Sequence, residues 1–166
     1  MSVCHNVYYF NPANDVALAH DSVKYTPNKN IQSLERDLGI LPFVFGDEND
    51  VVVVKRMPDD AHKNTLTQHG FRCPTFLTED AFLKSRVQLI LNIGEIRPWG
   101  WSKATHHFFK NVIPFASEHF KEGKNGRWNP ILRDYSCRLK ALEILDSVLD
   151  FHTEIFVSKD VLPMKA

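Results

Sequence analysis

Short apolar runs alternate along the chain with longer stretches in which apolar residues recur every three or four positions. The runs HNVYYF at 5–10, VVVV at 51–54 and VQLILNI at 87–93 predict strands, and the last two predict central strands because they are apolar on both faces. In FRCPTFL, Pro74 restricts a further strand to a sheet edge or an extended segment. Strands that alternate with helices predict an α/β domain with a layered, largely parallel sheet and flanking helices.

The helical patterns lie between these runs. NDVALAH at 14–20 predicts a short helix capped by Asn14 or Asp15. Residues 29–41 carry an amphipathic stripe of Ile31, Leu34, Leu38 and Leu41.

Capping residues mark three more helices. The segment 58–70 predicts a helix that begins near Asp59 or Asp60 and closes at Gly70, and Ser102 is placed to cap another. Asn129-Pro130 opens the longest predicted helix, whose apolar seam runs down to residue 149.

The stretch EGKNG at 122–126 is the most linker-like part of the chain and divides it into residues 1–126 and 127–166. The second part has a long helix, a short strand at 154–157 and no finishing element. Either this strand adds to the edge of the sheet, or the sequence is a fragment of a longer protein.

Charge and composition exclude several classes of partner. Twenty basic residues balance twenty acidic ones, so the chain has no overall field for nucleic acid or an anionic membrane. No run approaches the roughly 20 apolar residues that span a bilayer, and no signal peptide is visible. Three scattered cysteines do not form a disulfide framework, so we expect a cytoplasmic protein.

The loop NPANDVALA at 11–19 follows the first strand, a common ligand-binding position in α/β sheets. Asn11 and Asn14 donate and accept hydrogen bonds, and Asp15 accepts them, so this set could hold a polar substrate group. The alternative is that Asn11 and Asp15 satisfy the backbone of their own loop. Tyr25 and Thr26 supply a ring and a hydroxyl, although their simpler role is a rigid lead into the next helix.

The segment RPWGWS at 97–102 is the second unusual stretch. Trp99 and Trp101 either wall a pocket or plug the core, and Arg97 pairs with a ligand anion or with a surface carboxylate. No glycine-rich phosphate loop, nucleophile motif or set of metal ligands occurs, so the residues alone predict neither a catalytic group nor a metal site.

Taken together, NPANDVALA, YTPN, DLGILP and RPWGWS resemble a family of uncharacterised bacterial proteins that look like ATP-grasp enzymes, with the best match over the first 110 or so residues. The resemblance implies that the front part is a Rossmann-like pre-ATP-grasp domain that helps to bind the acceptor substrate. It also implies that SCRLKALEIL opens the ATP-grasp portion, and that Lys165 stands where the family has a lysine that contacts nucleotide phosphate.

The parent protein is then expected to be an ATP-dependent carboxylate–amine ligase, with ATP and magnesium bound only in a longer chain and this chain alone inactive. The partner expected for this part is a small-molecule substrate. The competing interpretation is a stand-alone, non-catalytic module that binds a ligand or a protein. A third expectation is a homodimer formed through the apolar seam of the C-terminal segment.

Overall fold

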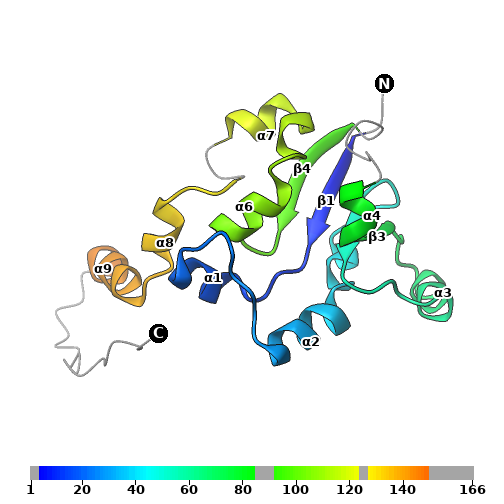
Figure 1. Ribbon diagram of the computed structural model, residues 1–166, viewed down its shortest axis with the longest axis horizontal. Coiled ribbons are helices and arrows are strands. Elements are labelled where there is room, and N and C mark those ends of the chain that lie inside the picture. The colour runs from blue at the N-terminus through cyan, green and yellow to red at the C-terminus, as the bar shows by residue number, and fades with distance from the viewer. Residues whose placement is uncertain (1–3, 85–91, 124–126, 150–166) are drawn as a thin grey trace.

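The computed structural model describes residues 4–84, 92–123 and 127–149. Within them lies a sheet of four parallel strands in the order β3-β2-β1-β4, flanked by helices (Figure 1). The strands are β1 (His5–Tyr9), β2 (Val51–Val54), β3 (Thr75–Thr78) and β4 (Ile93–Pro98). The predicted layered α/β fold with a parallel sheet is confirmed.

The sheet has a buried apolar layer on each face. Val51 and Val53 pack with Val7 into one core, whereas Val52 and Val54 pack into the other. Successive side chains of a strand point to opposite faces, so a strand covered on both sides needs apolar residues at every position. This explains why VVVV is buried throughout.

Helices from different parts of the chain cover the two faces. The first core is completed by residues of α4 (Glu79–Lys84), α6 (Lys103–Phe109), η2 (Ile113–Phe115) and α7 (Glu118–Glu122). The second is completed by residues of η1 (Leu41–Val44) and α3 (Asp60–Gln68) and by the residue before η1. The remaining helices are α1 (Asn14–His20), α2 (Lys29–Leu38), α8 (Ile131–Tyr135) and α9 (Arg138–Leu149).

Several predicted element ends are confirmed by their caps. The side chain of Ser102 accepts a hydrogen bond from the Thr105 N–H at the start of α6, and Asp59 does the same for His62 at the start of α3. Gly70 follows α3 with a φ of 84°, the left-handed conformation predicted for it. Strand β3 is an edge strand within the described sheet, as predicted from Pro74.

Three predictions are corrected. Helix α1 begins after Ala13 and has no side-chain cap, so neither Asn14 nor Asp15 caps it. Asn14 is instead the first helical residue, and its side chain packs against Gly100. The predicted single helix after Pro130 is split into α8 and α9 at residues 136–137.

The fourth strand extends through residues 94–98, which we expected to lie beyond it, and β4 is at an edge of the described sheet rather than central. Most of the apolar run at 87–93, the predicted strand at 154–157 and Lys165 lie outside the described residues.

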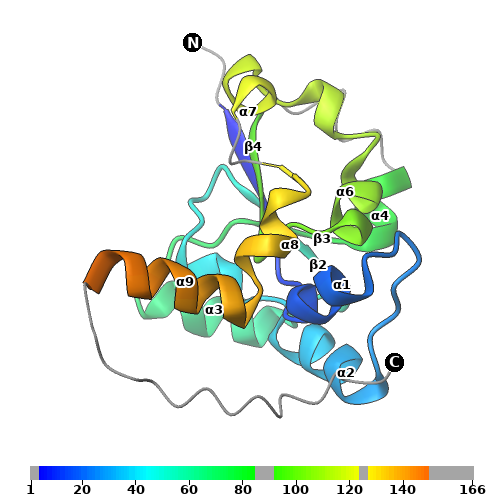
Figure 2. The same ribbon diagram turned by 90° about the vertical axis from the view of Figure 1, so that its left-hand side faces the viewer.

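Helices α8 and α9 lie away from the sheet (Figures 1 and 2). Both views place α8 beside α1, where Arg133 lies 3.4 Å from the Asp21 carboxylate. Apolar side chains of the predicted seam, including Tyr135 and Leu145, are exposed within the described part of the chain.

The strand order reverses direction next to β1. The chain moves from β1 outward to β2 and β3, and then returns to place β4 on the other side of β1. In open parallel sheets, ligands bind beyond the carboxyl ends of the strands at such a switch point. The loops after β1 and β4 therefore mark the place to look for a site.

Candidate functional site

A pocket of about 210 Å³ lies beyond the carboxyl ends of the strands. Every described strand contributes to its wall, either through its last residues or through the segment that follows it. The lining residues are Tyr9, Asn11, Ala13, Asn14, Ala17, Val23, Tyr25, Pro27, Glu35, Lys55, Glu79, Ser102, Ala104, Thr105 and Phe108. The pocket thus occupies the predicted switch point of the sheet.

Asn11 holds the loop after β1 against the loop after β4. Its Nδ2 donates to the Gly100 carbonyl (2.8 Å) and to Thr105 Oγ1 (2.9 Å), and its Oδ1 accepts from the Gly100 N–H (3.1 Å). The Asn11 residue is 7% exposed, so these three hydrogen bonds satisfy a buried amide. Asn11 therefore builds the pocket wall with its own hydrogen-bonding groups.

Asn14 packs against the same glycine, but its side-chain oxygen has no hydrogen-bond partner. A Cβ built on Gly100 would lie 2.2 Å from Asn14 Nδ2 and 2.4 Å from its Cγ, so the two residues fit together because position 100 has no side chain. Asn14 is 8% exposed, and its Oδ1 is buried with no hydrogen-bond partner. A buried acceptor without a partner is costly, and this one belongs to a residue that lines the pocket.

Glu79 and Tyr9 form the polar contact on the β3 side of the pocket. The Tyr9 hydroxyl donates to Glu79 Oε1 over 2.8 Å. Burial raises the pKa of Tyr9 far above its usual range, and the charge of Glu79 and its hydrogen bond raise it further. Tyr9 is therefore a neutral hydroxyl that donates to a carboxylate throughout the ordinary pH range.

Glu35 and Lys55 form an ion pair at another part of the wall. Lys55 Nζ lies 2.5 Å from Glu35 Oε2, with the Glu35 side chain 4% exposed and the Lys55 side chain 28% exposed. Lys55 is the first residue after β2, and Glu35 projects from α2. A carboxylate this deeply buried needs its cationic partner to offset the loss of hydration.

The sequence-predicted residues divide into two groups. Tyr25 lines the pocket with Asn11 and Asn14, and burial followed by the charge of Glu35 raises its pKa. Asp15 and Thr26 are exposed and do not line it.

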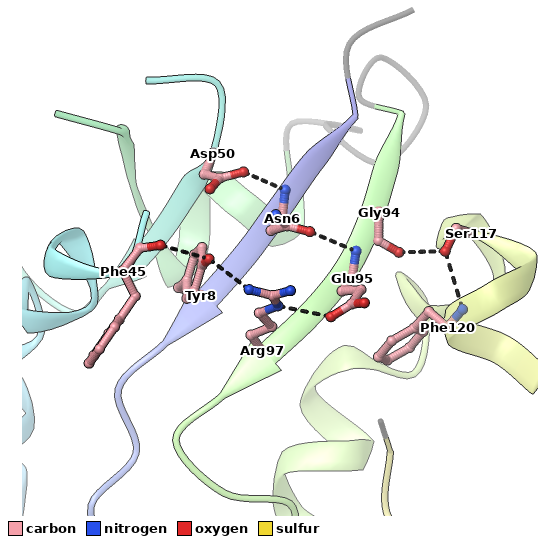
Figure 3. A network of polar contacts seen from close by, with 9 residues as sticks. All are labelled: Asn6, Tyr8, Phe45, Asp50, Gly94, Glu95, Arg97, Ser117 and Phe120. Atoms are coloured by element: carbon pink, nitrogen blue, oxygen red, sulfur yellow. Dashed lines mark hydrogen bonds and ion pairs between the residues drawn. The ribbon is translucent and has the colours of Figure 1, made fainter. Parts of the chain in front are cut away.

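Arg97 belongs to a polar network on the other face of the sheet (Figure 3). Its guanidinium lies 2.8 Å from the Glu95 carboxylate and donates to the Tyr8 hydroxyl over 3.1 Å, and that hydroxyl donates to the Phe45 carbonyl. Arg97 pairs in register with Tyr8 rather than with Tyr9, so it projects from the face opposite the pocket-lining tyrosine. The surface ion pair considered from the sequence is thus present.

The same network extends along β1 and β4. Asn6 links the strands, because its N–H donates to Asp50 and its Oδ1 accepts from the Glu95 N–H. Ser117 connects β4 to α7 by donating to the Gly94 carbonyl. These contacts fix the strands at the end of the sheet opposite the pocket.

The two tryptophans have different surroundings, and neither lines the pocket. Trp101 packs against the first core, with its ring centroid 6.1 Å from that of Phe109 and 6.3 Å from that of Phe120. Trp99 is 64% exposed and makes an edge contact with Phe10. The core-plug interpretation therefore describes Trp101 and not Trp99.

Sequence reasoning did not place six polar lining residues in the site: Tyr9, Glu35, Lys55, Glu79, Thr105 and Ser102, the last of which it gave only as a helix cap. Three of them could have been found by position, because Tyr9 ends β1 while Lys55 and Glu79 directly follow β2 and β3. Glu35 also had a signal, since it lies four residues after Ile31 and three before Leu38 on the apolar side of its helix.

Within residues 4–84, 92–123 and 127–149, no group of three or more His, Cys, Asp and Glu side chains is arranged to hold a metal ion. None of the described helices is long and apolar enough to cross a bilayer. Comparisons of the chain with protein-family models, curated proteins and solved structures find no match. The functional argument therefore starts from the pocket itself.

Proposed function

We propose that this chain is the substrate-side domain of an ATP-grasp carboxylate–amine ligase, and that its pocket holds a small-molecule substrate. In this proposal ATP and Mg²⁺ bind to other subdomains of a longer protein, and the 166 residues alone do not catalyse the reaction. The observation that carries the substrate-binding role is the pocket at the switch point of a parallel sheet, with the buried, unpartnered Oδ1 of Asn14 in its wall.

The arrangement of the motifs supports the same proposal. Asn11 and Asn14 from NPANDVALA contact Gly100 from RPWGWS, and Tyr25 from YTPN lines the same pocket. Three of the segments that resemble the ATP-grasp-like family thus meet at one place, although up to 89 positions separate the bonded residues.

The pocket is also too small to enclose a whole nucleotide. Its volume of about 210 Å³ is below the roughly 300–1,000 Å³ of pockets that enclose drug-sized ligands. It suits a small metabolite or one end of a larger one. This supports a role on the substrate side of the reaction.

Two titrations of the purified chain test the proposal. Calorimetry with ATP and Mg²⁺ should show no binding, and measurable nucleotide binding by these residues would contradict the assignment of ATP to other subdomains. A library of small metabolites of every charge, followed by amide chemical shifts, should yield a compound that perturbs Asn11 and Asn14. A library with no such compound would overturn the substrate-binding role.

The ligase activity is tested on the longest protein that the gene encodes. Supplied with ATP, Mg²⁺, a carboxylate substrate and an amine, that protein should form the amide with release of ADP and phosphate, and amide formation should stop when any one of them is omitted. ADP release by the 166-residue chain alone would contradict its proposed inactivity.

A non-catalytic protein-binding role is the second candidate, because α2 and η1 expose apolar side chains. Phe45 after η1 is 70% exposed and Val44 is 54% exposed, and Leu34 and Leu38 of α2 are 43% and 39% exposed. Contiguous exposed apolar surface is typical of interaction sites. If this role is the main one, Phe45→Ser should abolish partner binding while a metabolite library leaves the pocket unperturbed.

Self-association is the third proposal and uses a different surface. Tyr135 of α8 and Leu145 of α9 are both more than half exposed, as a helix pair that joins two chains would require. Sedimentation should then show a dimer that Leu145→Lys converts to a monomer. A wild-type chain that sediments as a monomer at all concentrations contradicts this proposal.

A further inference from the structure

The charged residues of the pocket leave it with excess negative charge. Its charged lining residues are Glu35, Lys55 and Glu79, two carboxylates and one ammonium. Lys55 is paired with Glu35. Glu79 receives a hydrogen bond from the neutral Tyr9 hydroxyl and forms no ion pair within the described part of the chain. One carboxylate charge at the pocket is therefore not neutralised.

The hydrogen-bonding groups of the wall show the same imbalance. Several donors of the wall are engaged: Asn11 Nδ2 with Gly100 and Thr105, the Tyr9 hydroxyl with Glu79, and one N–H of Lys55 with Glu35. An acceptor is left over, because Asn14 Oδ1 is buried without a partner, and a carboxylate such as that of Glu79 has room to accept more hydrogen bonds than one. A ligand that donates hydrogen bonds matches these acceptors.

The aromatic residues of the pocket suit a cation as well. The rings of Tyr9, Tyr25 and Phe108 line it, and Tyr9 and Phe108 are stacked with centroids 5.1 Å apart. Aromatic faces attract ammonium groups, most strongly where water is excluded. The raised pKa values of Tyr9 and Tyr25, caused first by burial and then by the nearby carboxylates, are consistent with a negative potential at both hydroxyls.

We propose that the pocket recognises a small molecule through a protonated amine, with the ammonium paired to Glu79 and one of its N–H groups donated to Asn14 Oδ1. This inference rests on the proposed function, since it requires the pocket to bind a small molecule. It adds which end of the substrate enters: the amine rather than a carboxylate. The partner of Glu79 is thus supplied by the ligand.

Three probes of equal chain length test the charge preference on the full chain. They are 1,3-diaminopropane, malonate and 1,3-propanediol, which differ in their end groups. Each is titrated separately while the backbone amide shifts of Asn11, Asn14 and Ala17 are recorded. We expect the diamine to shift these amides with saturation, the other two probes to leave them in place, and added salt to weaken diamine binding.

Two substitutions then locate the contact. Glu79→Gln keeps an oxygen that accepts from Tyr9 but removes the charge, and it should weaken diamine binding at least about tenfold, as expected for the loss of a charged hydrogen bond. Asp15→Asn removes the same charge from an exposed residue that does not line the pocket, and it should leave the affinity unchanged. The dispersion of the amide spectrum shows that each variant is folded.

The outcomes separate this inference from the proposed function. If malonate or 1,3-propanediol shifts the pocket amides and the diamine does not, the pocket binds small ligands but the amine assignment is wrong. If the diamine binds equally to wild type and Glu79→Gln, the assignment of Glu79 is wrong. If none of these probes and no compound of the metabolite library perturbs the pocket, both the inference and the proposed function fail.

Discussion

Replacing Gly100 with Ala should disrupt the contact that joins the loop after β4 to helix α1. A Cβ at this position would lie 2.2 Å from Asn14 Nδ2, 2.4 Å from Asn14 Cγ and 2.9 Å from Asn14 Cβ. The positive-φ glycine of the described chain is Gly70 and not Gly100, so the backbone at Gly100 accepts Ala without strain. The substitution therefore measures a steric overlap.

The expected cost follows from which atoms overlap. Rotation of the Asn14 side chain moves Nδ2 and Cγ away, but the Asn14 Cβ is held by helix α1, so the backbone of Gly100 or of α1 must shift as well. Overpacking of this kind costs about 1–3 kcal/mol. The shift also displaces Asn11, whose amide hydrogen-bonds to both the N–H and the carbonyl of Gly100, so ligand binding should weaken too.

Urea unfolding of four variants checks the reasoning: Gly100→Ala, Gly46→Ala, Asn14→Ala and the double variant Gly100→Ala with Asn14→Ala. Gly46→Ala is the matched control, because its nearest new contact would be Pro74 Cγ at an ordinary 3.5 Å. Adding Asn14→Ala to Gly100→Ala removes two of the three close contacts, so the double variant should be more stable than the sum of the single effects predicts. If Gly100→Ala unfolds at the same urea concentration as Gly46→Ala, or if Asn14→Ala brings no relief, the steric explanation is wrong.

Three further changes probe the buried polar groups. Lys55→Met leaves the carboxylate of Glu35 buried without its cation, and it should lower the free energy of unfolding by roughly 2–3 kcal/mol. This is below the full cost of breaking a buried pair because Lys55 is partly exposed. A much smaller loss of stability in urea unfolding would contradict the burial argument. Burial lowers the pKa of His106 from 6.5, so the folded state binds fewer protons there and stability should fall as the pH drops below about 6.5. That decline should shrink in His106→Gln and persist in the exposed control His69→Gln, because His69 is not among the groups that lower the pKa of His106. Ser102→Ala removes the cap of α6 and should cost about 1 kcal/mol in thermal unfolding, and an unchanged melting temperature would count against the cap.

The sheet could be predicted from the sequence because its signals are local. Four consecutive valines predict a strand that is covered on both faces, and all four are buried in β2. Pro74 likewise predicts that the next strand lies at an edge of the sheet. The last helix was predicted less well, since an apolar seam continues across Ser136 and Cys137 although the backbone breaks there. Periodicity reports which side chains share a face, and it is insensitive to a short interruption of the helix.

The site was predicted only in part, because its composition depends on pairing between distant residues. The sequence shows that Asn11 and Asn14 are unusual, but it does not show that Gly100 satisfies one of them and leaves the other with an unpaired oxygen. Trp99 and Arg97 drew attention for their chemistry, and the structure directs both away from the pocket. Which polar group remains available is a property of the assembled loops.

The conspicuous motifs and the residues that give the pocket its charge therefore have different roles. Asn11 and Gly100 satisfy each other's hydrogen bonds, so these parts of the motifs fix the shape of the wall and have little left to offer a ligand. The charge comes from Glu79, Glu35 and Lys55, which belong to no motif. Glu79 and Lys55 lie beside the pocket because parallel strands end at the same edge of a sheet, and Glu35 reaches it from α2. It follows that a protein could keep the motifs and the fold while a change at position 79 alters the charge of the ligand that it accepts. Glu79→Lys should accordingly reverse the preference between diamine and dicarboxylate, and it should also lower the free energy of unfolding because the Tyr9 hydroxyl loses its acceptor. A folded variant whose pocket still prefers the diamine would show that its selectivity comes from shape and not from charge.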